Sequence, residues 1–141
     1  MLVCLAACGA HLGRPPVALR VARVEVVARA AEPGLPAALE SAVRRALVER
    51  GAWGEDGSAL VLEVVQAGWG DWVTGGTAPT REVVLIVRAR GTGGTDDVTV
   101  RRVVPVGVSS AEGAAVRAEA LARLAAEAAE VLVARGSVPP G

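Results

Sequence analysis

Two strands of a β-hairpin are encoded by residues 81–106, REVVLIVRARGTGGTDDVTVRRVVPV. In residues 81–90, every second side chain is apolar, which places Val83, Leu85, Val87 and Ala89 on one face. Residues 98–106 are rich in valine, and the glycines and threonines of residues 91–96 have the composition of a turn. Two such segments on either side of a turn predict antiparallel strands at residues 81–90 and 98–106.

A third strand is predicted at residues 59–67, just before the hairpin. Leu60, Leu62 and Val64 lie on one face of this segment, and Val61 and Val65 lie on the other. Because both faces are apolar, we expect a buried strand rather than an exposed edge. The intervening residues 68–79 are rich in glycine, which predicts a loop. That loop holds Trp69 and Trp72, which would either cover the end of the sheet or belong to a binding surface.

The first strand is predicted at residues 17–27. Its apolar residues alternate through Val17, Leu19 and Val21, and the alternation then slips by one position to Val24 and Val26. A slip of one residue indicates either a β-bulge or a strand that begins near Leu19.

Two amphipathic helices complete the pattern. The first opens in the Pro-Gly-Leu-Pro segment at residues 33–36 and ends at Gly51, which is placed as a C-terminal cap. The second opens with a capping box formed by Ser109 and Glu112 and runs to Arg135, closed by Gly136. Their apolar positions recur at helical spacing, at Leu35, Leu39, Ala42, Val43, Ala46 and Leu47 in the first and Leu121, Leu124, Ala128, Val131 and Leu132 in the second.

The resulting order is β-α-β-β-β-α, which predicts an α+β fold. We expect a four-stranded, mostly antiparallel sheet with both helices packed on one face, because that arrangement buries the apolar stripe of each helix and one face of the sheet. Residues 17–136 would form this single domain, and residues 137–141 a flexible tail.

Composition narrows the function. The 141 residues contain no Phe or Tyr and three Trp, so the core must be built mainly from Val, Leu and Ala. The net charge is zero, which gives no indication of a nucleic-acid partner. No apolar run in the body reaches the roughly 18 residues that span a bilayer.

Residues for catalysis are scarce. His11 is the single histidine, and Cys4 and Cys8 are the only cysteines. A histidine-based catalytic triad within the domain is therefore excluded, and we expect a protein that is not an enzyme, with no catalytic residue, metal or cofactor. The adjacent carboxylates of Asp96 and Asp97 would point apart on an extended chain, which favours a solvated turn over a cation site.

The N-terminal segment Leu5-Ala6-Ala7-Cys8 resembles a lipobox, the processing signal of bacterial lipoproteins. In this signal, small residues precede a cysteine whose thiol carries the lipid. The resemblance implies a signal remnant at residues 1–7, a fatty-acylated Cys8 and a tether at residues 8–16. Only seven residues without a positive charge precede Cys8, so we expect the signal to begin upstream of Met1.

Beyond Cys8, the opening Cys8-Gly-Ala-His-Leu-Gly-Arg14 is similar to the mature start of the LptE family of lipopolysaccharide-assembly lipoproteins, although Ala10 replaces the family's aromatic residue. The resemblance implies two helices on a four-stranded sheet. It also implies an outer-membrane lipoprotein on the periplasmic face that assists an LptD-like β-barrel in lipopolysaccharide transport. The alternative is another periplasm-facing lipoprotein, such as a pilotin or an envelope scaffold.

Four arginines on the hairpin are the candidates for contact with lipopolysaccharide: Arg88, Arg90, Arg101 and Arg102. Guanidinium groups on the outer face of a sheet could hold phosphate through paired hydrogen bonds. The alternative interpretation is a solvated face on which these arginines pair with glutamates.

Overall fold

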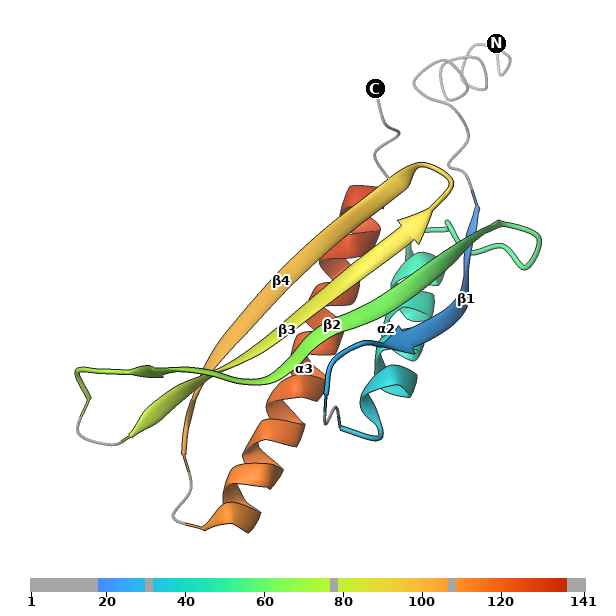
Figure 1. The fold of residues 1–141 in the computed structure, drawn as a ribbon. Coiled ribbons are helices and arrows are strands. Elements are labelled where there is room, and N and C mark those ends of the chain that lie inside the picture. The colour runs from blue at the N-terminus through green and yellow to red at the C-terminus, as the bar shows by residue number, and fades with distance from the viewer. Residues whose placement is uncertain (1–17, 30–31, 77–78, 107–108, 137–141) are drawn as a thin grey trace.

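The computed structural model describes residues 18–29, 32–76, 79–106 and 109–136 (Figure 1). Along the chain the elements are β1 (Leu19–Val26), α2 (Leu35–Glu49), β2 (Ser58–Val73), β3 (Thr80–Gly91), β4 (Gly94–Pro105) and α3 (Ser110–Gly136). The predicted signal remnant, Cys8, the tether and the C-terminal tail lie outside the described residues, so these assignments stay predictions.

The four strands form one sheet in the order β1-β2-β3-β4. β1 pairs with β2 in parallel, since α2 connects them, and β2–β3 and β3–β4 are antiparallel. Both helices lie on the same side of the sheet (Figure 1). The predicted α+β class and the β-α-β-β-β-α order are confirmed, and β2 lies inside the sheet as its two apolar faces predicted.

Both explanations of the slipped alternation in the first strand hold. β1 begins at Leu19, and its register against β2 shifts between Val21 and Arg23. The extra residue of the bulge reverses the face toward which the following side chains point. Val24 therefore packs against the core, as Val21 does, although the two residues are separated by an odd number of positions.

The predicted loop at residues 68–79 is wrong over its first half, because β2 continues through it to Val73. Trp69 pairs with Val83, and Trp72 pairs with Arg81, with a register shift between the two tryptophans. A Cβ atom at Gly70 would lie 2.7 Å from a methyl group of Val84, so a glycine there permits close approach of the strands.

The predicted turn at residues 91–96 is also too long. β3 extends to Gly91 and β4 begins at Gly94, which leaves two residues in the turn. Gly94 has a φ of 123°, a conformation that favours glycine. Asp96 and Asp97 therefore belong to β4 rather than to a turn.

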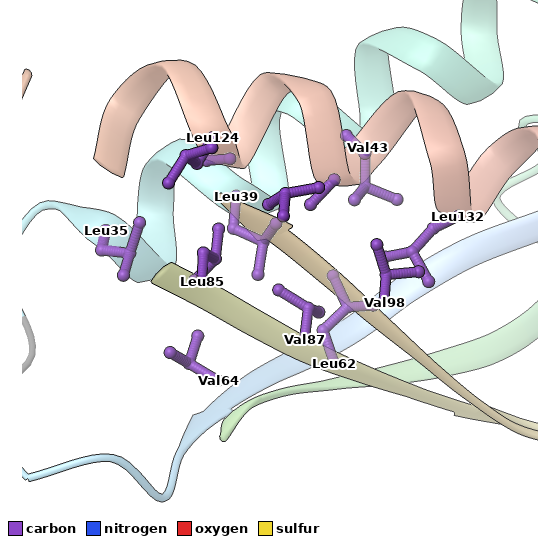
Figure 2. Packing of buried hydrophobic residues seen from close by; sticks show 14 of the residues in the cluster. Leu35, Leu39, Val43, Leu62, Val64, Leu85, Val87, Val98, Leu124 and Leu132 are labelled. Carbon is purple, nitrogen blue, oxygen red and sulfur yellow. The ribbon is translucent and has the colours of Figure 1, made fainter. Parts of the chain in front are cut away.

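The core lies between the sheet and the two helices and consists of Val, Leu and Ala side chains (Figure 2). Its largest fully buried residues are Leu39, Leu47, Leu62, Leu85, Leu121 and Leu124. Alanines at 125, 128 and 129 are buried on α3, and their small size lets α3 pack closely on its neighbours. Among the described residues, no polar or charged side chain is buried.

The C-terminal end of α2 and the N-terminal end of α3 have the caps that the sequence predicted. Gly51 has a φ of 67°, and its N–H donates to the carbonyl of Val48 at 3.0 Å. At the start of α3, the Ser109 hydroxyl accepts a hydrogen bond from the Glu112 N–H at 3.1 Å. Neither of the two described helices combines the length and the hydropathy needed to cross a membrane.

Candidate functional site

The four candidate arginines lie on β3 and β4, but they do not form one cluster. Arg88 and Arg90 alternate with the core-facing Val87 and Ala89, so they lie on the outer face of the sheet, away from the helices. Arg101 shares this outer face, where it pairs with Val84. It stands four positions along β4 from Asp97, the partner of Arg88, or roughly 13 Å.

Arg102 occupies the other side of β4. It pairs with the buried Val83, and its neighbours on the same side are Val100 and Val104, which face the helices. Arg102 is nevertheless exposed, because β4 is the outermost strand. The structure therefore places three of the four predicted residues on one face and Arg102 on the opposite face.

The outer face carries a continuous chain of ion pairs across all four strands, which we call the ion network. It consists of Arg23, Glu25, Glu63, Arg88, Arg90 and Asp97.

Glu63 occupies the middle of the ion network on β2. One of its carboxylate oxygens lies 2.6 Å from Arg90, and the other lies 3.7 Å from Arg88. From there the chain runs to β4, where Asp97 accepts two hydrogen bonds from Arg88 at 2.8 and 3.2 Å. In the other direction, Arg90 lies 3.3 Å from Glu25 on β1.

The ion network ends at Arg23 on β1, whose Nε donates a hydrogen bond to the Glu25 carboxylate at 2.7 Å. Three guanidinium groups thus alternate with three carboxylates, and the network carries no net charge. The alternative interpretation, a solvated face on which the arginines pair with glutamates, agrees with the contacts of Arg88 and Arg90 with Glu63, and Arg88 also pairs with Asp97.

The contacts within the network shift the pKa values of three of its side chains. The hydrogen bond from Arg88 lowers the pKa of Asp97, and the hydrogen bond from Arg23 lowers the pKa of Glu25. The same contact with Asp97 raises the pKa of Arg88. These contacts favour the charged forms of Asp97, Glu25 and Arg88.

The side chains of Arg101 and Arg102 make far fewer contacts with charged groups than those of Arg88 and Arg90. The Nε of Arg101 lies 4.0 Å from Glu82, at the limit of an ion pair, and the Arg101 side chain is 61% exposed. Within the described part of the chain, the Arg102 side chain makes no ion pair or hydrogen bond. These two arginines on β4 are therefore the hairpin cations that are most available to a ligand or a partner.

A second surface feature lies on the extension of the β2–β3 hairpin, where sequence reasoning missed the role of Arg81. The Arg81 guanidinium lies between Trp69 and Trp72, at 5.4 and 5.1 Å from the ring centroids. Its Nε also donates to the carbonyl of Gly70 at 2.8 Å. Trp69 is partly buried against the core, whereas Trp72 is 55% exposed, so of these two residues Trp72 offers the larger aromatic surface to a partner.

The two adjacent aspartates of β4 point to opposite faces, as expected for neighbours on an extended strand. Asp97 contacts Arg88 on the outer face, and Asp96 lies 3.2 Å from Arg135 of α3 on the helix side. Among the described residues, no three His, Cys, Asp or Glu side chains gather closely enough to hold a metal ion.

Comparison of the sequence with protein-family models and with curated proteins gives no match. Solved structures do match by fold. A candidate lipoprotein of Caulobacter crescentus superposes with a TM-score of 0.51 and 18% identity, over 81% of this chain and 87% of that one. At this identity the likeness shows a shared fold.

Two further solved structures match less closely. A minor lipoprotein of Acinetobacter baumannii gives a TM-score of 0.49 and 15% identity, over 86% of this chain and 93% of that one. A Xanthomonas campestris protein gives 0.48 and 18%, over 86% and 88% of the two chains.

Proposed function

We propose that the protein is a lipid-anchored domain of the bacterial cell envelope that acts by binding and not by catalysis. The observation that carries the proposal is the Leu5-Ala6-Ala7-Cys8 sequence, a lipobox-like segment at the head of a domain with a lipoprotein-like fold. The fold shared with the candidate lipoprotein of Caulobacter crescentus supports it. Acylation at Cys8 would hold the domain close to the membrane.

Replacing the lipid-bearing thiol tests the anchor directly. In cells that express the gene with its own signal sequence, Cys8→Ser should abolish incorporation of labelled palmitate, and in cells that lack a β-barrel partner it should release the protein from washed membranes. A single acyl chain gives only marginal membrane binding, whereas two or more hold a protein stably, so the release should be nearly complete. Cys4→Ser is the matched control and should stay labelled. Palmitate labelling of the Cys8→Ser variant would contradict the proposal.

The more specific form of the proposal is an LptE-like role in the outer membrane, in which the domain assists an LptD-like β-barrel in assembly and lipopolysaccharide transport. The resemblance of Cys8–Arg14 to that family supports it, and so does the arrangement of two helices on a four-stranded sheet. Co-purification in mild detergent tests this role. A large β-barrel that carries lipopolysaccharide supports it, and recovery of other envelope proteins alone favours the pilotin or scaffold alternative.

Lipopolysaccharide contact can be assigned to residues with paired variants. We expect Arg101→Ala/Arg102→Ala to weaken binding at least tenfold through the loss of charge-assisted bonds to phosphate, because the only ion pair of Arg101 within the described chain is the 4.0 Å contact with Glu82 and the Arg102 side chain has none there. Arg88→Ala/Arg90→Ala should weaken it less, since these side chains already hold Glu63 and Asp97. Binding would be measured with the full chain carrying Cys8→Ser, and thermal unfolding would control for folding. An equal affinity for all three proteins would remove these arginines from the site.

A further inference from the structure

β4 is an edge strand with an unusual charge order. It forms one border of the sheet, and its central residues 96–102 read Asp-Asp-Val-Thr-Val-Arg-Arg. Two acidic residues and two basic residues are thus placed symmetrically about Thr99. A strand with this order is electrostatically complementary to an antiparallel copy of itself.

The outer edge of β4 has the backbone groups that such pairing needs. In an antiparallel strand, the backbone groups of alternate residues point toward the paired strand and away from it. The N–H of Val106 donates to the carbonyl of Pro79, so even-numbered residues point toward β3 and odd-numbered ones point outward. Thr99 therefore presents its N–H and carbonyl to the outside. Arg135 donates to the outward carbonyl of Asp97 at 3.0 Å, which leaves that oxygen a second lone pair.

Antiparallel pairing centred on Thr99 brings opposite charges together on both faces. Asp97 would lie beside Arg101 of a second copy on the outer face, and Asp96 beside Arg102 of that copy on the helix side. Thr95 would lie beside Val103, a hydrophobic side chain that is 53% exposed in the single chain. The pairing thus supplies a partner for Arg102, which has none within the described chain.

The register is specific, because a shift in either direction separates the charges. Shifting the pairing by two residues one way places Asp97 beside Val103, and shifting it the other way places Asp97 beside Thr99. Charged residues often protect edge strands against association, but they do so when like charges meet or when a charge faces an apolar surface. Here self-association brings unlike charges together, so the pattern favours pairing.

The helices permit the same arrangement. α3 packs over β3 and β4, and α2 packs mainly over β1, so each helix covers about two strands. Two strands span roughly 9.6 Å, which matches the 8–10 Å separation of packed helices. Joining two sheets through β4 therefore continues the helix layer at its normal spacing.

We infer that β4 is the interface for a second copy of this chain, which pairs antiparallel about Thr99 to form a two-fold dimer with one continuous eight-stranded sheet. The occupant is identified by the charge complementarity of β4 with itself. The dimer needs no lipid or barrel partner, so its tests are independent of the proposed function.

A disulfide at the symmetry axis tests the register. In the full chain with Cys4→Ser and Cys8→Ser, Thr99→Cys would face its own copy at about 5.5 Å between Cα atoms, within the range that a disulfide spans. Mild oxidation should convert this variant to a covalent dimer. The control Thr95→Cys is also exposed on the same edge, but it would face Val103 and lie roughly 27 Å from its own copy. Equal crosslinking of the two variants, or of neither, would overturn the inference.

Charge reversal tests the complementarity. Sedimentation of the unlipidated chain, without lipid, should show a dimer that Arg101→Glu/Arg102→Glu weakens by at least about 100-fold, because four ion pairs become repulsive. Asp96→Arg/Asp97→Arg should weaken it similarly, and an equimolar mixture of the two variants should form a heterodimer. Circular dichroism would control for folding. A monomeric parent chain, or a mixture in which two folded variants do not associate, would contradict the proposed dimer.

Discussion

The two faces of the sheet are stabilised by different interactions. At the centre of the helix-covered face, Leu62, Leu85 and Val87 are fully buried against α2 and α3. On the outer face, the neighbouring positions Glu63 and Arg88 belong to the ion network. The comparison shows that the same strands bury apolar side chains on one face and hold paired charges on the other, because successive side chains point in opposite directions.

Truncation on the helix-covered face should have the largest effect. Leu85→Ala removes a fully buried side chain and leaves a cavity, so we expect the free energy of unfolding to fall by about 2–5 kcal/mol. Urea denaturation followed by circular dichroism measures it. Ile86→Ala on the same strand is the matched control, and it should cost clearly less because Ile86 is only partly buried on the outer face. Equal losses would mean that the outer face is also covered.

An intermediate effect is expected from the central carboxylate of the ion network. Glu63→Gln removes the partner of Arg90 at 2.6 Å and of Arg88 at 3.7 Å, and the Glu63 side chain is only 13% exposed. We expect the free energy of unfolding to fall by about 1 kcal/mol, as for a hydrogen bond to a charged group that is partly shielded from water. The same urea titration measures this loss.

Glu119→Gln is the control for Glu63→Gln. Glu119 pairs with Arg123 one turn along α3, but its side chain is 69% exposed. Such a pair contributes at most about 0.5 kcal/mol. If both substitutions cost the same, the ion network contributes no more than an isolated surface pair.

The difference between the faces also explains what the sequence could predict. Burial is repetitive along an element, so the alternation of Val83, Leu85 and Val87 predicted a strand and its inner face. The slip before Val24 indicated either a bulge or a strand that begins near Leu19, and β1 has both features. The β-α-β-β-β-α order then left few ways to bury both helices.

Contacts on the outer face depend on residues that are distant in the sequence. Glu25 meets Arg90 only because β1 is placed beside β2 in one register, which local patterns do not reveal. The extension of β2 was missed because glycine is depleted in strands, yet Gly70 is required where β2 approaches Val84. A glycine between two tryptophans could have suggested close strand approach rather than a loop.

The smallest expected effect is a dependence of stability on pH that arises at Asp97. Its pKa is lowered in the folded chain by the hydrogen bond from Arg88, whereas in the unfolded chain it would titrate near its ordinary value of about 3.9. A lowered pKa means that the folded state binds its proton less readily. The contribution of Asp97 is therefore fully present above the unfolded pKa and is lost as the pH falls through the folded pKa. Glu25 acts in the same direction through Arg23.

Urea denaturation of the parent chain and of Asp97→Asn at a series of pH values would measure this contribution. We expect a constant difference in the free energy of unfolding between about pH 7 and pH 5, and a decrease below about pH 4. Asp56→Asn is the control, because Asp56 is exposed in the turn before β2 and makes no ion pair within the described chain. A difference that instead grew as the pH fell would mean that the ionised Asp97 destabilises the fold, and the outer face would then have to be described without a stabilising ion network.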